Sequence, residues 1–216
     1  MRLTVLFALV LSAAAVPAQA QTAAPANDQP YYAEISGHSA FGNVTSQSYG
    51  LEFGANVKPN LDVVVEIAHT RDAATADLSA GALKIAGALT TLQPATVTYS
   101  AKEPVTFGTA GVRYRIQTEG RARPYVLAGI GVARVNNNVT FQIGGVDATS
   151  TISQYVALGT DLSGSLTKAM ATFGAGIVLP VHGDIIVDLQ YRFGRVFAGD
   201  SSITINRAGL GLGYRF

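Results

Sequence analysis

The sequence predicts an all-β fold, an eight-stranded antiparallel up-and-down β-barrel that spans a membrane. Three observations lead to this prediction. Apolar side chains recur at every second position in eight segments of roughly ten residues. Glycine is abundant, at 23 of 216 residues, and only 13% of residues are charged. The connections between the segments alternate between short and long.

The composition excludes several classes of protein. Mean hydropathy is +0.27, which is apolar for a chain whose body contains no long apolar helix. Cysteine is absent, so the chain has no disulfide framework, thiolate metal site or cysteine nucleophile. The formal net charge is +1, and no basic patch indicates binding to nucleic acid.

The N-terminus has the pattern of a secretory signal. Arg2 precedes an apolar run from Leu3 to Val16, and small residues at Ala18 and Ala20 suit a signal peptidase. The run is shorter than the roughly 20 residues that a membrane-spanning helix needs. The predicted organisation is a signal peptide at 1–20, a polar periplasmic leader at 21–30 and an outer-membrane barrel at 31–216.

The alternation is clearest in the segment VDLQYRF. Leu189 and Tyr191 fall on one face, whereas Asp188, Gln190 and Arg192 fall on the other. In a soluble sheet the polar face would carry many Lys, Thr, Ser and Glu residues, but here it carries mainly Gly and Arg. This pattern indicates lipid outside and a polar lumen inside, and the sheet must close because a bilayer tolerates no open edge.

Eight segments follow this rule, and their even number places both chain ends on the periplasmic side. The predicted strands are Tyr31–Phe41, Ser48–Lys58, Leu61–Arg71, Pro104–Ile116, Pro124–Arg134, Lys168–Leu179, Asp184–Phe193 and Ser202–Phe216.

The connections divide into two rims. KPN, QTEGRAR and PVHGD are short and rich in turn residues, which suits the periplasmic rim. Asp72–Glu103 and Val135–Thr167 are long, and loops of that length are usually functional, so we expect both on the outer side. The other two outer connections, Gly42–Gln47 and Gly194–Ser201, are shorter.

The long loops contain local structure of their own. Ala76–Leu89 is rich in Ala and Leu and predicts a helix. A hairpin about Gly144 and Gly145 would extend the flanking strands beyond the membrane. If either loop supplied another membrane-crossing pair, the barrel would instead have ten strands.

The inward face predicts a network of charged side chains in the lumen. An eight-stranded barrel is only wide enough for side chains to fill it, so Arg–carboxylate pairs packed over glycines should block flow. The alternative is a narrow, charge-lined ion pore. The predicted network comprises Glu34, Glu52, Glu66, Arg113, Arg115, Asp188, Arg192, Arg207 and Arg215.

Other motifs carry little functional information. The Gly-x-Gly pairs lack the full dinucleotide fingerprint, and the three histidines lack metal-ligand spacing, so no cofactor or metal site is predicted. A further alternative is a hydrolase that modifies lipid A, built from His38 and Ser39 near Glu52 or Glu66. A nucleophile and base need hydrogen-bond geometry, which a sequence does not show.

The chain resembles the small bacterial outer-membrane β-barrels of the OmpA, OmpX and opacity-like type. The resemblance covers Tyr31–Phe216 and is most specific in the terminal GLGLGYRF. There Gly211, Tyr214 and Phe216 match the family's C-terminal assembly signal of a glycine, a hydrophobic residue and a final aromatic. This match implies that the barrel-assembly machinery reads Phe216.

The resemblance also implies a function and a location. It implies a non-enzymatic protein of the cell outer membrane that serves envelope integrity, adhesion or host contact through its long outer loops. The implied partners are outer-membrane lipid and lipopolysaccharide, with periplasmic chaperones and the barrel-assembly machinery during biogenesis. The loops are mostly Ala, Thr, Ser and Gly, so they identify no surface ligand.

Overall fold

The computed structural model describes residues 30–92, 95–155, 162–198 and 201–216. The predicted signal peptide at 1–20, and all of the predicted leader except Pro30, lie outside the described residues.

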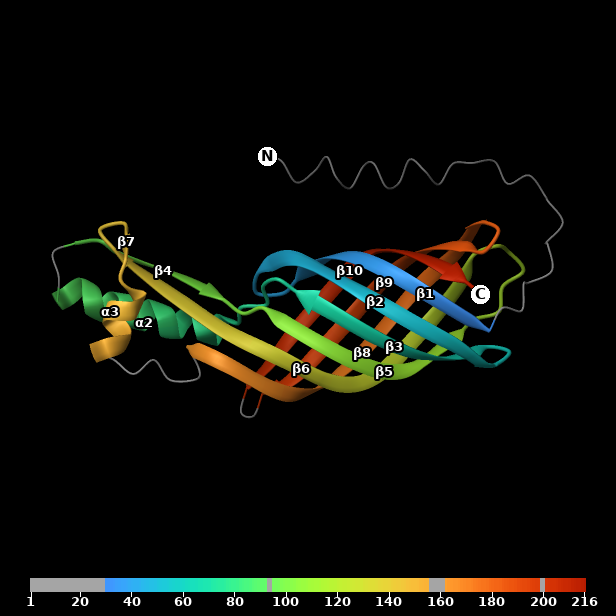
Figure 1. The fold of residues 1–216 in the computed structure, drawn as a ribbon, viewed down its shortest axis with the longest axis horizontal. Coiled ribbons are helices and arrows are strands. Elements are labelled where there is room, and N and C mark those ends of the chain that lie inside the picture. The colour runs from blue at the N-terminus through green and yellow to red at the C-terminus, as the bar shows by residue number, and fades with distance from the viewer. Residues whose placement is uncertain (1–29, 93–94, 156–161, 199–200) are drawn as a thin grey trace.

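Within the described chain, eight strands form a closed antiparallel ring, in which each strand pairs with the next along the chain (Figure 1). This confirms the predicted eight-stranded up-and-down barrel. The strands are β1 (Tyr31–Phe41), β2 (Thr45–Lys58), β3 (Leu61–Thr70), β5 (Val105–Arg115), β6 (Arg123–Ile143), β8 (Ser163–His182), β9 (Ile185–Ala198) and β10 (Ser201–Arg215).

The first and last strands close the ring. β1 pairs along its length with residues 206–215 of β10, with Ile35 opposite Leu212. Tyr31 N donates to Phe216 O at 3.1 Å, and Phe216 N donates to Tyr31 O at 3.0 Å. The backbone groups that an open edge would leave unpaired are therefore satisfied.

The two faces of the wall differ as the alternation predicts. In β9, Leu189 and Tyr191 are exposed on the outside, whereas Asp188, Gln190 and Arg192 are buried in the lumen. The exposed large side chains of the other barrel strands are likewise mostly aliphatic or aromatic. This outer surface fits a hydrocarbon solvent.

Two strands continue beyond the segments predicted to cross the membrane, as the expected hairpin implied. β6 has 21 residues and β8 has 20, so the bounds placed at Arg134 and Lys168 are too short. The polar run Asn136–Asn138 resembles a loop in sequence, but it pairs with Ser163–Ser165 of β8. The two short outer connections are also shorter than predicted, because β2 begins at Thr45 and β9 continues to Ala198.

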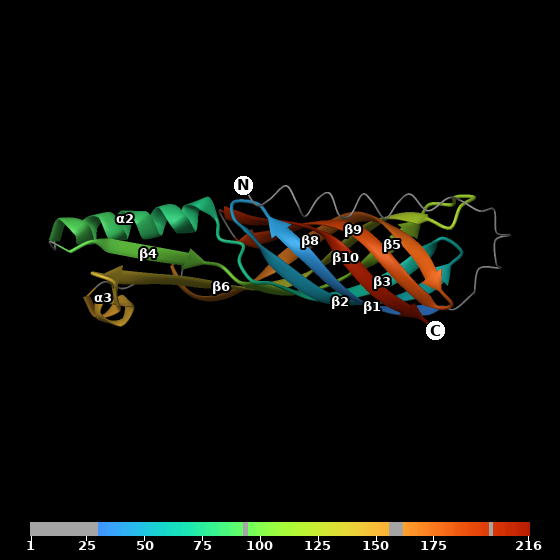
Figure 2. The ribbon, with the colours of Figure 1, turned by 90° about the horizontal axis from the view of Figure 1, so that it is seen from above.

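The long connections fold against the outer end of β6. They contain α2 (Ala76–Leu92), β4 (Val97–Lys102), β7 (Val146–Asp147) and α3 (Thr149–Tyr155). With residues 136–143 of β6 these elements form what we call the outer lobe, which extends from the end of the barrel opposite the C-terminus (Figures 1 and 2). In the described sheet β4 and β7 pair only with β6, so they add no wall strand and the ten-strand alternative is wrong.

The outer lobe has its own apolar core. Leu78, Ala82 and Ala86 of α2 pack with Phe141 of β6 and Ile152 of α3, and all five are buried. Their spacing along α2 places the three helix residues on one face. The predicted helix is confirmed and extends to Leu92.

Local signals fix the ends of these lobe elements. Thr75 caps α2, because its Oγ1 accepts a hydrogen bond from Leu78 N at 3.2 Å. The predicted turn at Gly144 and Gly145 joins β6 to β7, and the φ angles of +58° and +83° there favour glycine.

No helix of the described chain is both long and apolar enough to cross a bilayer.

Candidate functional site

The lumen is filled by three layers of side chains. The layer nearest the chain ends is apolar and aromatic and contains Tyr32, Val64, Tyr125, Leu127, Val178 and Ile186. The layer nearest the outer lobe is also apolar and includes Phe107, Met170, Val196, Ile203 and Ile205. Buried charged side chains lie between them. The lumen is therefore charged in its middle, and further charged side chains lie at its end near the chain termini, namely Asp62, Arg115, Arg123 and Arg215.

Arg207 and Glu66 form one pair of the middle layer. Arg207 Nη1 donates to Glu66 Oε1 at 2.7 Å and Nη2 donates to Oε2 at 3.2 Å. The guanidinium also lies 4.7 Å from the centre of the Phe107 ring. Both charged side chains are buried, so the bidentate contact offsets the cost of removing them from water.

Arg192 of β9 connects this strand to β2 across the lumen. Its Nη2 donates to Glu52 Oε2 at 2.7 Å, and its Nε donates to Gln190 Oε1 at 2.9 Å. Gln190 in turn donates from Nε2 to Glu34 Oε1 at 2.7 Å. Four side chains from three strands are thus connected in one chain of hydrogen bonds.

Arg113 lies at the boundary between the middle layer and the aromatic layer. Its guanidinium is 3.4 Å from Glu52 and 3.6 Å from Asp188. The guanidinium carbon lies 4.2 Å and 4.7 Å from the ring centres of Tyr32 and Tyr125. Each tyrosine hydroxyl donates at 2.7 Å to a carboxylate, Tyr32 to Glu52 and Tyr125 to Asp188. Both rings therefore lie within cation–π distance of the Arg113 guanidinium.

Two of the predicted network residues lie at its edge. Arg115 is 3.2 Å from Asp62 and donates to the carbonyl oxygen of Pro59 at 3.2 Å, and its side chain is 26% exposed. Arg215 lines a cavity at the end of the lumen near the chain termini. The other seven predicted residues lie in the buried middle layer or at its boundary.

The predicted assembly residues divide between the two faces. Gly211 faces the lumen, where a side chain would meet Glu34. Tyr214 and Phe216 face outward and are each about half exposed. The Phe216 ring lies 6.0 Å from that of Tyr31 and 6.3 Å from that of Phe53, which forms an aromatic cluster at the rim.

Sequence reasoning missed several members of the network. Asp62 shares the inward face with Glu66, four residues away on the same strand, so the alternation contained the signal. Gln190 could have been found in the same way. Tyr32 and Tyr125 gave no such signal, because they are large aromatic residues on a face where the pattern predicts polar or small ones.

The middle layer is closely packed around Glu52, Glu66 and Arg192. The space between Glu52, Glu66 and Arg192 contains no cavity large enough for a water molecule. The described residues also include no group of three metal-ligating side chains.

The candidate His38 and Ser39 pair is wrong. His38 is buried in the lumen, whereas Ser39 is exposed on the outside. Neighbouring residues of a strand point to opposite faces, so the two side chains cannot form a nucleophile and its base.

The chain is similar to solved structures and to one family of proteins. Neisserial surface protein A matches with a TM-score of 0.54 and 13% identity over 86% of this chain and 96% of that protein. Ail, the attachment invasion locus protein of Yersinia pestis, matches with a TM-score of 0.49 and 17% identity over 87% and 99%. No curated protein matches the sequence. A family model described as the outer membrane protein beta-barrel domain matches residues 6–216. The chain therefore belongs to the outer membrane protein β-barrel family and is a protein of the outer membrane.

Proposed function

We propose that this protein is a non-enzymatic outer-membrane protein in which a closed barrel anchors an outer lobe that makes contacts at the cell surface. The observation that carries the proposal is the lobe's own buried core, formed by α2, α3 and the outer part of β6. A long connection without a function would not need such a core. The lobe is also continuous with the wall through β6.

The barrel supplies the anchor. Its outward face is apolar, and seven of its nine predicted lumen residues, all except Arg115 and Arg215, act as ties that join non-neighbouring strands across the interior. Glu66 of β3 meets Arg207 of β10, and Glu52 of β2 meets Arg192 of β9. Gly211, Tyr214 and Phe216 serve as the signal for assembly, and residues 1–20 serve as the cleaved export signal.

The arrangement of the lumen argues against the alternative of an ion pore. An ion would have to pass two apolar layers and a middle layer whose charged groups already pair with one another. The separation of His38 from Ser39 argues against the hydrolase alternative.

A pair of substitutions in α2 tests the surface role. Ala82 is fully buried in the lobe core, whereas its neighbour Leu83 is 58% exposed. Ala82→Asp places a charge in that core and should disrupt the lobe without touching the barrel, and Leu83→Asp is the matched control. Cells that produce each variant are scored for adhesion to matrix proteins and cultured cells and for leakage of a periplasmic enzyme.

We expect Ala82→Asp to reduce adhesion to the level of a strain without the protein, with no increase in leakage. The protein must still show the heat-dependent gel mobility of a folded barrel. Equal adhesion of Ala82→Asp, wild type and the deletion strain would contradict a role in surface contact and leave a purely architectural one.

A further inference from the structure

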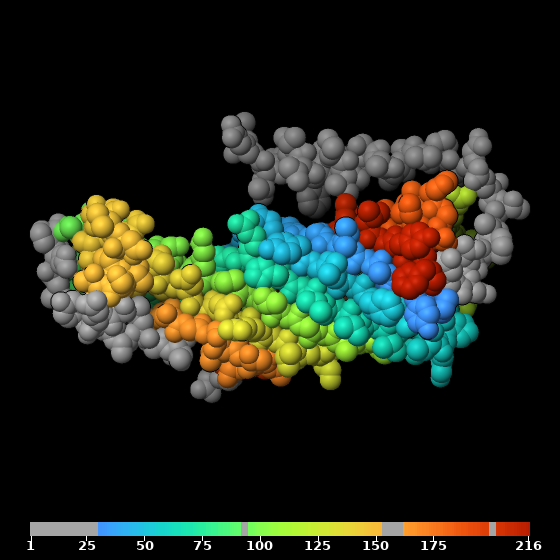
Figure 3. All heavy atoms as spheres, in the orientation of Figure 1, coloured from blue at the N-terminus to red at the C-terminus, as the bar shows by residue number. Residues whose placement is uncertain are grey.

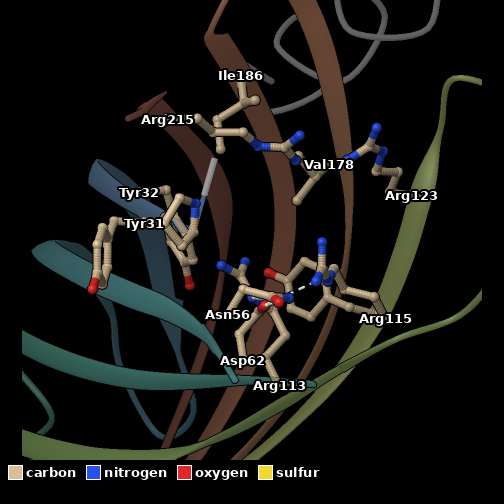
Figure 4. A pocket seen from close by; sticks show the side chains of 12 residues that line it. Tyr31, Tyr32, Asn56, Asp62, Arg113, Arg115, Arg123, Val178, Ile186 and Arg215 are labelled. Atoms are coloured by element: carbon tan, nitrogen blue, oxygen red, sulfur yellow. Dashed lines mark hydrogen bonds and ion pairs between the residues drawn. The ribbon is translucent and has the colours of Figure 1, made fainter. Parts of the chain in front are cut away.

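A cavity of about 40 Å³ lies at the periplasmic mouth of the barrel, where β6 begins and β10 ends. Four of its lining residues are arginines, at positions 113, 115, 123 and 215, and Figure 4 shows them around the cavity. Among the described residues that line it, Asp62 is the only carboxylate. The lining therefore has a formal excess of three positive charges.

The one carboxylate is already engaged on its own side of the cavity. Asp62 lies 3.2 Å from Arg115 and 3.6 Å from Arg113, and it accepts a hydrogen bond from Asn56 at 3.1 Å. Figure 4 shows Arg123 and Arg215 on the opposite side of the cavity. Two guanidinium groups thus face the space without a carboxylate between them.

One buried donor at this site has no acceptor among the described residues. Arg115 Nε donates no hydrogen bond to any of them. The Nε and Nη1 atoms of Arg113 lie 3.6 Å from Asp62 and Asp188, which is an ion-pair contact without a hydrogen bond. A buried donor without an acceptor is costly, and an acceptor in the cavity would remove that cost for Arg115.

We propose that this cavity binds a phosphate-type oxyanion from the periplasm, with Arg123 and Arg215 on one side of the anion and Arg115 on the other. Planar guanidinium groups match the oxygens of a phosphate in pairs. A volume of 40 Å³ accommodates a few waters at roughly 10–15 Å³ each, which suits one oxyanion group and excludes a nucleotide. This site is separate from the surface role of the outer lobe.

Titration of inorganic phosphate into the purified mature protein tests the proposal. The protein is kept in a maltoside detergent free of phospholipid, at low salt and pH 7, and the heat of binding is measured. The test variant is Arg123→Gln/Arg215→Gln. The matched control is Arg121→Gln, which removes one charge from the same turn at a residue that does not line the cavity. Circular dichroism and heat-dependent gel mobility verify that each variant is folded.

We expect saturable binding to the wild type, at least about tenfold weaker binding to the double variant, and no change in the control, because charge-assisted hydrogen bonds are lost only in the double variant. Arg123→Lys keeps the charge without the planar fork and should fall between them. Absence of saturable binding to the wild type would overturn the proposal. So would equal binding by the wild type and the folded double variant.

A second titration distinguishes two sources of the phosphate group. sn-Glycero-3-phosphoethanolamine carries the phosphodiester head group of a phospholipid without its acyl chains. Binding as tight as that of inorganic phosphate would identify lipid head groups as ligands the site can take. Much weaker binding would identify free phosphate.

Discussion

Arg207 on β10 donates two hydrogen bonds, of 2.7 Å and 3.2 Å, to Glu66 on β3. β1 and β2 separate these strands in the wall, so the contact crosses the lumen. A side-chain contact of this kind joins parts of the barrel that the backbone ladder joins only through two intervening strands.

Breaking this contact from one side should destabilise the barrel. Glu66→Leu leaves the buried Arg207 charge without its partner, and such losses cost about 3–5 kcal/mol. Urea unfolding of the refolded protein in phospholipid vesicles measures the change. Arg134→Gln is the control, because this exposed arginine should change stability by less than about 0.5 kcal/mol.

Removing both partners should cost less than the two single losses together. Glu66→Leu/Arg207→Met leaves no unpaired charge, and apolar replacements of a buried pair are often close to neutral. An additive double variant would show that the two residues do not interact in the folded barrel.

The final aromatic residue should matter for assembly. Phe216→Ser removes a ring that lies beside those of Tyr31 and Phe53 at the rim that holds the chain ends, where β1 meets β10. We expect less folded protein in the outer membrane, measured from heat-dependent gel mobility of membrane fractions. Leu210→Ser changes an outward residue of β10 away from this cluster and should reduce folded protein less. Equal losses of folded protein in the two variants would show that assembly depends on the hydrophobicity of the outward face and not on Phe216 in particular.

The attachment of the outer lobe should depend on pH. Burial raises the pKa of Glu103 from 4.5 to about 7, and the nearby Asp72 carboxylate adds to the increase, although the Thr75 backbone amide opposes it. A raised pKa in the folded state means that docking of the lobe is weakened as pH rises from about 4.5 through 7. Hydrogen exchange of α2, corrected for the intrinsic rate, should therefore be slower at pH 5 than at pH 8.

Glu103→Gln is the test of this assignment. The amide stays neutral, so α2 should exchange at the same corrected rate at pH 5 and pH 8. A pH dependence that survives the substitution would assign the effect to a different group.

The filled lumen predicts an electrically silent protein. Two apolar layers and paired charges occupy the interior, so the refolded protein should give no stepwise conductance in planar bilayers. Reproducible conductance steps that change with Arg192→Ala would support the pore alternative instead.

The orientation of the wall can be measured directly, because the chain contains no cysteine to interfere with labelling. A spin label at Leu189 should be accessible to oxygen dissolved in the bilayer, whereas a label at Gln190 should not. The reverse result would place the polar side chains against lipid and contradict the barrel as described.

The alternation of residues predicted the ring because each wall strand has one side in lipid and the other in the lumen. The alternation predicted both ends of β1 correctly and the ends of most other strands to within a few residues. It failed at the outer ends of β6 and β8, because a strand that leaves the bilayer no longer needs an apolar face. Asn136–Asn138 therefore resembled a loop.

The lumen was harder to predict than the wall. The alternation assigns residues to the inside but does not say at what depth they meet, so partners such as Glu52 and Arg192, 140 residues apart, depend on the register of the whole ring. The alternation also did not predict the apolar outer layer around Phe107 and Met170, because it assigns only polar or small residues to the inward face.

The continuity of β6 has a mechanical consequence. A force that pulls on the outer lobe enters the wall along the axis of this strand, where β5 and β8 flank it on both sides. The load then acts in shear, so many backbone hydrogen bonds share it at once. These bonds do not open one after another. A cell tethered through this lobe would hold against drag more firmly than one tethered through a flexible loop.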